Sequence, residues 1–384
     1  MDYLQLATQF LEPKLKGKYI HLDSIFPLLQ SLNSDFEISQ IGKSVQGRAI
    51  HQVKIGTGKT KVLMWSQMHG NESTTTKGLL DFFNFLQSDN EFAKRIKLNY
   101  TLLCIPMLNP DGAYLYTREN ANKVDLNRDA FNATQPEMQL LRKIYTDFQP
   151  DYCYNLHDQR TIFGTEGYNL PATVSFLSPA FNELREYNSV RLKSISIINK
   201  MNNALQVYIP NQVGRFDDSY NVNCTGDYFT TQNTPTILFE AGHYEKDYDR
   251  DQVRKYIFVA LLSSFDASYE NVIVDNELSK YLNIPQNNKC FYDFIYKNVK
   301  IIDNNEEKII NFAAQYTEVI EQGELKFIAI IDKINNLQDF KGHVEYDCKN
   351  GLFSSKTSNF PKIGDNSSFF INNLTKFNNG VKII

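Results

Sequence analysis

The sequence has few cysteines and no long apolar segment. Its five cysteines among 384 residues are widely spaced, odd in number and include no Cys-x-x-Cys pair. This pattern argues against a disulfide framework and a thiolate metal site, and it predicts free, mostly buried thiols in a reducing compartment. The longest apolar runs, such as residues 256–262, are far too short to cross a bilayer, so we expect no membrane span.

The sequence also lacks a strong excess of either charge. Its formal net charge is −4, whereas proteins that bind nucleic acids usually carry a concentrated basic face. We therefore expect no nucleic-acid partner. Residues 1–22 contain no basic segment leading into an apolar one, so we expect no signal peptide and predict a cytoplasmic location. The oligomeric state cannot be deduced from this composition.

Short apolar runs alternate with helical patterns through about residue 270. The apolar runs predict strands over residues 61–68, 98–107, 151–156 and 235–240. Helical periodicity predicts helices over residues 74–87, 136–148, 178–206 and 249–265. This alternation indicates an α/β domain with a mixed, largely parallel central sheet flanked by helices.

The composition changes after about residue 275. Asparagine becomes frequent, and strand-like runs at 290–302 and 323–334 are separated by polar turns. We therefore predict an α/β domain over residues 1–275 and a smaller, mainly-β domain over 285–384, with a linker between them. A structural or partner-docking role is the default expectation for the smaller domain.

The segment SQMHGNESTTT (66–76) places His69 and Glu72 three residues apart, directly after a predicted strand. One explanation is an ordinary strand-to-helix turn, in which the helix dipole favours the negative charge of Glu72. The other is that the two side chains share a metal ion. His157 and Glu240 also lie at the ends of predicted strands, and ligands of open α/β sheets collect at the carboxyl ends of strands. This recurrence favours a metal site.

Two imidazoles and one carboxylate form a ligand set that suits zinc, whose catalytic sites leave a fourth position to water. The sequence therefore predicts a site for one Zn²⁺ per chain at His69, Glu72 and His157. Glu240, which is not a ligand in this arrangement, is the candidate to take the proton of that water.

A polar segment follows the turn NPDG (109–112) and contains Arg118, Asn127 and Arg128. Standing alone, it would be interpreted as a solvated loop. Beside a metal site it is a candidate pair of anion sites, because a guanidinium group offers a planar fork to a carboxylate and can also stabilise an oxyanion.

Five motifs, taken in order, resemble those of the zinc metallocarboxypeptidases of the carboxypeptidase A type. They are HGNE (69–72), NPDG (109–112), TREN…VDLNRD (117–129), NLH (155–157) and FE (239–240). GKSVQGRAI (42–50) also resembles the segment that precedes the first catalytic-domain strands of that family. The likeness spans residues 20–265, and the ordered set is specific although each motif alone is not.

The resemblance implies a peptidase that hydrolyses the bond next to a free C-terminal carboxylate. His69, Glu72 and His157 would hold the zinc ion. Glu240 would act as general base and then as general acid, and Arg118 would stabilise the oxyanion.

The resemblance also implies a substrate site. Asn127 and Arg128 would bind the terminal carboxylate of a peptide. Tyr220 would be the mobile tyrosine that covers the substrate in this family, with Tyr228 as the alternative, and residues 225–227 would line the side-chain pocket. Asp158 and His243 lie beside these residues in the sequence, and we expect them to form local hydrogen bonds.

Two other functions share these motifs. The aspartoacylase and succinylglutamate desuccinylase family has HGNE, a DLNR-like clamp, a later histidine and a catalytic glutamate, and it too carries a C-terminal β domain. NPDG, the TREN spacing and GKSVQGRAI favour the peptidase over this zinc-dependent N-acyl amino acid deacylase. A non-catalytic binding protein would usually have lost a ligand or the base, and this chain retains all of them. Ordinary peptides, murein stem peptides and protein tails remain equal as substrates.

Overall fold

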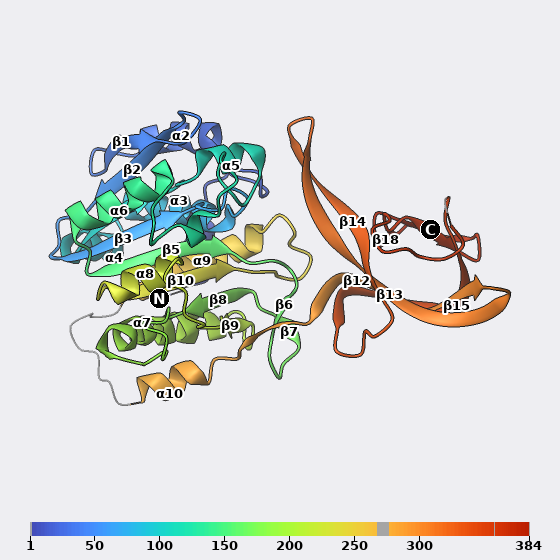
Figure 1. The fold of residues 1–384 in the computed structure, drawn as a ribbon. Helices are drawn as coiled ribbons and strands as arrows, with labels where there is room; N and C mark the ends of the chain where they lie inside the picture. Colours follow the sequence, from blue (N-terminus) through green and yellow to red (C-terminus); the bar gives the residue numbers. More distant parts are fainter. Residues whose placement is uncertain (1, 267–275, 357, 384) are drawn as a thin grey trace. The chain divides into compact units, whose positions relative to one another are not determined.

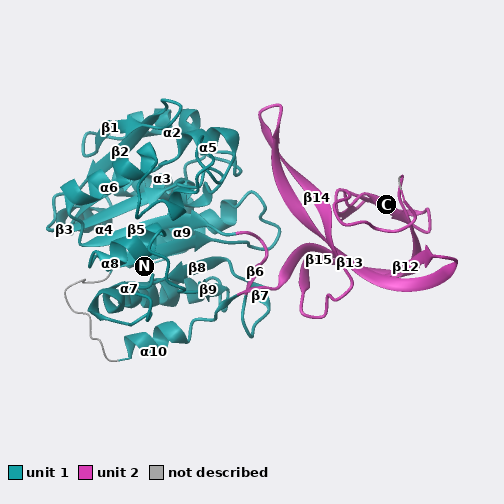
Figure 2. Cartoon of the chain, viewed as in Figure 1, with its two compact units in different colours: residues 1–159, 165–287 teal, residues 160–164, 288–384 magenta. Residues whose placement is uncertain are grey.

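The structure, a computed structural model, describes residues 2–266, 276–356 and 358–383. The chain divides into two compact units, shown in different colours in Figure 2. The first unit contains residues 1–159 and 165–287, and the second contains residues 160–164 and 288–384. Residue 275, the expected end of the first domain, lies outside the described residues. The short segment 160–164 groups with the second unit, which no feature of the sequence indicated.

The first unit is built on an eight-stranded sheet with the order β1-β2-β4-β3-β5-β10-β8-β9 (Figure 1). Its strands are β1 (Glu37–Lys43), β2 (Ala49–Ile55), β3 (Thr60–Ser66), β4 (Tyr100–Ile105), β5 (Tyr152–Asp158), β8 (Val174–Leu177), β9 (Val213–Arg215) and β10 (Thr236–Ala241). The four central strands β4, β3, β5 and β10 are parallel neighbours, whereas β1–β2, β2–β4 and β10–β8 are antiparallel pairs. The predicted mixed, largely parallel sheet is confirmed.

Helices flank this sheet. They are α1 (Tyr3–Gln9), α2 (Leu22–Gln30), α3 (Thr74–Leu86), α4 (Glu91–Asn99), α5 (Pro110–Leu115), α6 (Pro136–Phe148), α7 (Ser189–Gln206), α8 (Thr225–Thr231), α9 (Asp251–Ser264) and α10 (Glu277–Leu282), with a single 3-10 turn, η1, at Leu126–Arg128. None of the helices in the described part of the chain is both long and apolar enough to cross a membrane.

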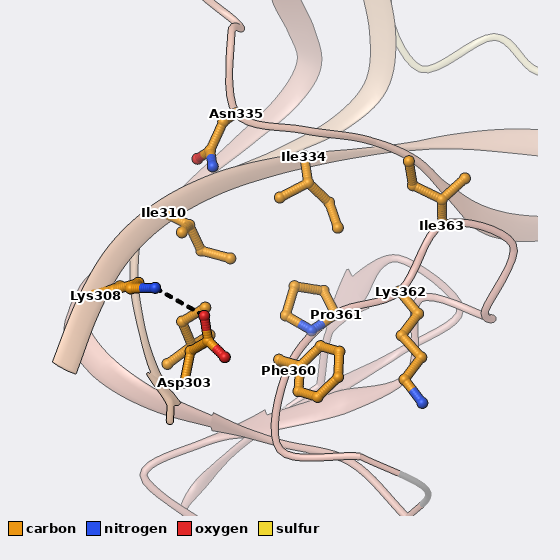
Figure 3. A pocket seen from close by; sticks show the side chains of 10 residues that line it. Asp303, Lys308, Ile310, Ile334, Asn335, Phe360, Pro361, Lys362 and Ile363 are labelled. Carbon is orange, nitrogen blue, oxygen red and sulfur yellow. Dashed lines mark hydrogen bonds and ion pairs between the residues drawn. The ribbon is translucent and has the colours of Figure 1, made fainter. Parts of the chain in front are cut away.

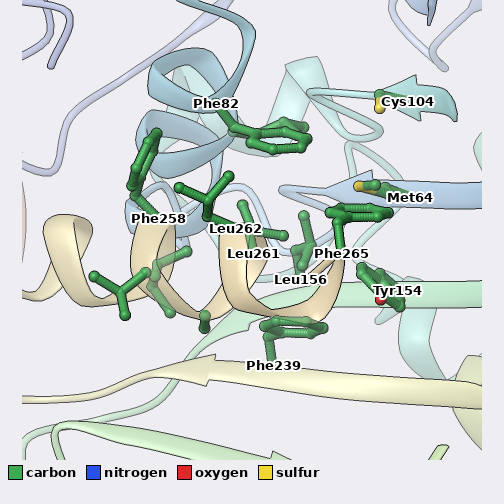
Figure 4. Close-up of a cluster of buried hydrophobic side chains, with 14 of the residues drawn as sticks. Met64, Phe82, Cys104, Tyr154, Leu156, Phe239, Phe258, Leu261, Leu262 and Phe265 are labelled. Carbon is green, nitrogen blue, oxygen red and sulfur yellow. The ribbon is translucent and has the colours of Figure 1, made fainter. Parts of the chain in front are cut away.

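The two faces of the sheet carry separate cores, because successive side chains of a strand point to opposite faces. Met64 and Tyr154 pack in the large core that contains the apolar faces of α3 and α9 (Figure 4). Trp65 and Cys153, the next residue of β3 and the previous residue of β5, pack in a second core with α6 and α8. The central strands are therefore covered on both faces, which fixes the position of their carboxyl ends.

Most predicted elements are found within a few residues of their expected bounds, and α6 matches the predicted range 136–148. The predicted helix over 178–206 is wrong at its start, since α7 begins only at Ser189. Asn188 caps this helix by accepting a hydrogen bond from the backbone of Arg191. Before it, Arg185 has a positive φ of 57°, and Leu184 is 79% exposed. No continuous apolar face holds residues 178–188 in a helix.

The second unit is mainly β structure, as predicted. Its seven-stranded sheet has the order β14-β13-β12-β15-β16-β17-β18. The strands are β12 (Phe291–Asp303), β13 (Glu306–Glu321), β14 (Glu324–Ile334), β15 (Lys341–Ser354), β16 (Phe369–Ile371), β17 (Thr375–Asn378) and β18 (Val381–Lys382). Outside the two large sheets the described residues include three short strands: β6 (Phe163–Thr165), β7 (Leu170–Pro171), which lies in the first unit, and β11 (Asn287–Lys289). Tyr296 lies at the centre of the core of this unit, against Phe312, Phe369 and Phe377.

A cavity of about 580 Å³ lies in the second unit (Figure 3). Ile301, Ile310 and Ile334 of the sheet line it together with residues 360–363. The charged lining includes an ion pair, in which the ammonium group of Lys308 lies 2.7 Å from the carboxylate of Asp303.

The five cysteines of the chain are all free, and Cys104, Cys153 and Cys348 are buried.

Candidate metal centre

The carboxyl ends of three neighbouring parallel strands carry the site residues predicted from the sequence. His69 follows β3, which pairs with β5. His157 lies near the end of β5, and Glu240 lies near the end of β10. In the register of β5 and β10, His157 and Glu240 are direct partners. Because parallel strands end at the same edge of a sheet, residues separated by more than 170 positions reach one site.

The turn after β3 has an unusual backbone that aims His69 into this edge. Gln67 has a positive φ of 51°, and its side-chain amide donates hydrogen bonds to the carbonyl groups of Ile20 and Gly70 at 2.7 and 2.8 Å. A Cβ atom at Gly70 would lie 1.9 Å from the backbone carbon of Gly112. Only glycine fits this approach of two backbones, which explains why the HGNE and NPDG motifs occur together.

The occurrence of GKSVQGRAI together with NPDG also has a structural explanation. Asp111 of NPDG accepts hydrogen bonds from the Ser44 hydroxyl and the Gln46 backbone, both at 2.9 Å. The guanidinium group of Arg48 lies 2.6 Å from the same carboxylate. GKSVQGR is therefore the segment that satisfies the buried carboxylate of Asp111 and holds the NPDG turn in place.

His69, Glu72 and His157 form a compact group of possible metal ligands. The Nδ1 atoms of the two histidines lie 3.0 Å apart. The Glu72 carboxylate oxygens lie 2.9 Å from Nδ1 of His69 and 2.8 Å from Nδ1 of His157. Both histidines are 2% exposed. Ligands of a tetrahedral zinc ion, each about 2.0–2.1 Å from it, lie roughly 3.3 Å apart, so a small expansion of this triangle fits the ion.

The electrostatics of His157 and Glu72 suit metal binding. Burial lowers the pKa of His157 to about 4, so its imidazole is neutral and has a free lone pair near neutral pH. Burial also acts to raise the pKa of Glu72, but the adjacent His69 and His157 more than offset this and hold it well below its usual range. A neutral imidazole and an ionised carboxylate are the forms that bind divalent cations.

A second carboxylate orients the first histidine. Nε2 of His69 lies 2.9 Å from Oδ1 of Asp125. Such a bond leaves Nδ1 of the imidazole free for a metal, and it increases the basicity of that nitrogen. Asp125 was not among the residues predicted from the sequence, although it lies within the VDLNRD motif, two residues before Asn127.

Arg118 links the carboxylates of the site. Its Nη1 donates to Oε1 of Glu72 and its Nε donates to Oδ2 of Asp125, both at 3.1 Å. The side chain is 41% exposed, unlike the histidines. Its guanidinium group therefore lies between the buried ligands and the solvent, where a substrate oxygen can reach it.

Glu240 carries a buried carboxylate oxygen without a hydrogen bond. Its Oε2 has no partner among the described residues. Burial raises the pKa of Glu240 well above its usual value, and the negative charges of Glu72 and Asp158 raise it further. A carboxylate with a raised pKa beside a metal site is typical of a group that exchanges protons.

Asn127 and Arg128 lie on η1, directly after Asp125. The side-chain oxygen of Asn127 accepts a hydrogen bond from the Thr225 backbone at 2.9 Å. Nη1 of Arg128 donates to the carbonyl group of Asn127 at 2.7 Å and contacts Sγ of Cys224 at 3.2 Å. Arg128 is otherwise exposed. The start of α8 thus holds both side chains near the metal ligands.

The two tyrosine candidates differ in their surroundings. Tyr228 packs as a core aromatic, with the guanidinium carbon of Arg142 4.8 Å from its ring centre and Phe229 beside it. Tyr220 is partly exposed, and in the described part of the chain it hydrogen-bonds to none of the metal-centre residues. Burial raises the pKa of Tyr220, and the negative charges of Asp227 and Glu183 raise it further.

The two residues expected to form local hydrogen bonds also differ. Asp158 accepts hydrogen bonds from the backbones of Thr74 and Thr75, at 2.9 and 3.2 Å, and so stabilises the start of α3 far along the chain. The ring of His243 lies 4.8 Å from that of Tyr248. Neither side chain is a member of the ligand triangle.

Comparison with known proteins agrees with this geometry. Residues 24–160 match the family model of zinc carboxypeptidases (Peptidase_M14). Probable carboxypeptidase 2 of Arthroderma benhamiae is 24% identical over 123 residues, which are 32% of this chain and 22% of that protein. The carboxypeptidase N catalytic chain of Rattus norvegicus is 29% identical over 152 residues, 33% of either chain. The chain thus spans between a fifth and a third of the length of these relatives.

Solved structures show the same fold. Thrombin-activatable fibrinolysis inhibitor superimposes with a TM-score of 0.51 at 13% identity, over 70% of this chain and 81% of that one. A metallo-carboxypeptidase from Pseudomonas aeruginosa, solved with (2-guanidinoethylmercapto)succinic acid, gives a TM-score of 0.50 at 16% identity, over 62% of this chain and 68% of that one. Except for its last residue, the match to the zinc carboxypeptidase family lies within the first unit of the chain. His69, Glu72 and His157 form the metal site typical of that family.

Proposed function

We propose that this protein is a zinc-dependent metallocarboxypeptidase that hydrolyses the peptide bond next to a free C-terminal carboxylate. The observation that carries the proposal is the ligand triangle of His69, Glu72 and His157, with edges of 2.8–3.0 Å, beside the carboxylate of Glu240. A zinc ion held there supplies Lewis acidity and lowers the pKa of a water molecule bound to it.

Glu240 and Arg118 have different roles in the hydrolysis. Glu240 accepts a proton from the attacking water on its carboxylate and later donates it to the departing amine. Arg118, whose guanidinium group reaches the solvent edge of the site, donates hydrogen bonds to the oxygen of the scissile carbonyl as negative charge develops on it. The raised pKa of Glu240 suits a group that must both accept and release a proton.

Asn127 and Arg128 recognise the end of the substrate. Arg128 is exposed. The amide oxygen of Asn127 accepts a hydrogen bond from the backbone of Thr225, so its amide nitrogen is the group that can donate to a ligand. A terminal carboxylate can pair with these donors, whereas an amidated terminus brings no charge to them. Tyr220, the less packed of the two tyrosines, covers the bound peptide.

The test compares three substrate classes with zinc-loaded, full-length protein. A peptide library with free C-termini, its amidated counterpart and a set of N-acyl amino acids are digested and analysed by mass spectrometry, with and without chelator. We expect chelator-sensitive release of single C-terminal residues from the free peptides alone. Cleavage of the N-acyl amino acids alone would show that the protein is an N-acyl amino acid deacylase and not a peptidase. Cleavage of amidated peptides as fast as free peptides would refute the role of Asn127 and Arg128.

A further inference from the structure

A buried arginine outside the five motifs named above joins the ends of the two strands that carry His157 and Glu240. Arg250 is 1% exposed. Its Nη1 donates a hydrogen bond to the carbonyl group of Ala241, the residue after Glu240, at 2.9 Å. Its Nη2 donates to the carbonyl group of Gln159, two residues after His157, also at 2.9 Å. One planar guanidinium group thus spans β10 and the exit of β5.

The regular pairing of β5 with β10 ends at this contact. Beyond the pair of Asp158 and Ala241 the regular ladder of β5 and β10 ends, and one further backbone bond joins Gln159 to Ala241 at 2.8 Å. After that, Gly242 bonds to Thr173 instead, and the two chains separate. Arg250 therefore acts at the point where the strands diverge, directly behind the two site residues.

The position of Arg250 is itself tightly fixed. It has a positive φ of 60° and precedes α9. Asp247 accepts hydrogen bonds from the backbones of Asp251, Gln252 and Val253, at 2.8–2.9 Å, and so caps the same helix. A left-handed conformation at a residue other than glycine is unfavourable and persists where the surroundings enforce it. The capped end of α9 thus presents the guanidinium group to the strand ends.

The guanidinium group of Arg250 is not fully hydrogen-bonded. The Nε of Arg250 has no hydrogen-bond partner among the described residues. Burying a guanidinium group that is not fully hydrogen-bonded costs free energy, and both side-chain bonds that Arg250 makes hold strand ends at the site.

We propose that Arg250 is a positioning residue that holds the carboxylate of Glu240 and the imidazole of His157 at their working separation. It does not touch the substrate; it acts through the backbone of Ala241 and Gln159. The inference rests on the proposed function for its kinetic test, because the separation of these two groups matters to a hydrolysis that uses both. A displacement of about 1 Å in such a site can cost about 100-fold in rate.

Arg254 provides a matched control on the same helix. It is also 1% exposed, and it pairs with Asp81 through two hydrogen bonds of 2.6 and 2.5 Å. It bonds further to the carbonyl groups of Leu15 and Glu12, which are not at the site. A change at Arg254 therefore disturbs the packing of α9 without releasing the ends of β5 and β10.

The experiment uses full-length, zinc-loaded Arg250→Gln, Arg250→Lys and Arg254→Lys. We expect Arg250→Gln to lower kcat about 100-fold on a free-C-terminus peptide with KM changed less than threefold, while it still binds one zinc ion per chain. Arg250→Lys should lie between this variant and the native protein, because an ammonium group can bond to one of the two carbonyl groups. Added guanidinium ion at a non-denaturing concentration should restore part of the rate of Arg250→Gln. Arg254→Lys should lower the melting temperature but keep kcat.

A second readout does not depend on catalysis. With Co²⁺ in place of zinc, the visible absorption spectrum reports the ligand geometry, and it should change in Arg250→Gln but not in Arg254→Lys. Native kcat and a native spectrum in a folded Arg250 variant would overturn the proposal. It would also be overturned if the Arg250 and Arg254 variants lost rate equally, in proportion to the fall in their melting temperatures. If native protein cleaves no peptide, the proposed function fails, and a spectral change confined to the Arg250 variants still supports positioning. Should Arg250→Gln not fold, Arg250→Lys decides the same questions.

Discussion

His157 and Glu240 are paired residues on adjacent parallel strands, so an imidazole that can bind metal and a carboxylate that does not belong to the ligand triangle share one end of the sheet. Side chains of paired residues on parallel strands point to the same face, about 5 Å apart at the backbone. The sheet thus brings the metal ligand and the candidate base to the same place, with no loop between them.

This relationship predicts the behaviour of Glu240→Gln. The substitution keeps the size of the side chain but removes its basicity, so we expect stoichiometric zinc binding together with a loss of kcat of at least about 100-fold, because general acid–base groups typically contribute 10²–10⁴. Zinc is measured by elemental analysis and kcat with a free-C-terminus peptide. Glu245→Gln, at an exposed position five residues away, should leave both unchanged. Near-native hydrolysis by Glu240→Gln would refute the role of Glu240 as base.

Arg118→Ala should lower kcat by about two to three orders of magnitude, which is the typical effect of losing one oxyanion donor. The reason is its exposed guanidinium group beside Glu72, which is available to an oxygen of the substrate. The appropriate comparison is Arg142→Ala, because Arg142 packs over the ring of Tyr228 and bonds to the carbonyl group of Phe131. If both arginine variants retain native kcat, Arg118 has no part in the chemistry.

Asp125→Asn should weaken zinc binding without abolishing it. A carboxylate that bonds to the far nitrogen of a ligating histidine typically contributes 10- to 100-fold to metal affinity, and Asp125 holds this position beside His69. Competition with a chromogenic chelator measures the affinity. Asp151→Asn serves as the control, since Asp151 bonds to the backbone of Lys61 and not to the metal centre. An unchanged affinity in Asp125→Asn would show that His69 is oriented by other contacts.

The residues that could be predicted from the sequence are those that follow a regular strand. His69, His157 and Glu240 come after or within buried apolar runs, and the parallel order of β3, β5 and β10 brings them together. The ligand set followed from residue types and from this rule of convergence. The confirmed bounds of α6 depend in the same way on local signals, with a proline at its first position and one apolar face.

What the sequence did not reveal depends on contacts between distant segments. Asp125 and Arg250 gain their roles from partners 56 and 91 residues away. The false start of the helix over 178–188 has the same origin, because the backbone of Ala180 bonds to the side chain of Asp227 and not within a helix. Local periodicity cannot register such competing partners.

Asp227 should make the stability of the protein depend on pH. Burial raises its pKa to about 7, although the backbones of Asn221 and Ala180 donate hydrogen bonds to its carboxylate. Because the folded state binds this proton more tightly than the unfolded state does, the contribution of Asp227 to stability is complete below about pH 4 and is lost as the pH rises through about 7. A shift of about three units corresponds to about 4 kcal/mol at most.

Asp227→Asn cannot ionise and keeps one of the two acceptor oxygens. Its stability relative to the native protein should therefore rise between about pH 4 and pH 7 and then remain level. Melting temperatures of both proteins across this range test the prediction. For Asp217→Asn the stability relative to the native protein should change with pH in the opposite direction. Hydrogen bonds from Ser219 lower the pKa of Asp217, so its ionised form is the one favoured in the folded state. A stability difference between Asp227→Asn and the native protein that does not vary with pH would mean that burial does not raise the pKa of Asp227 and would contradict the prediction.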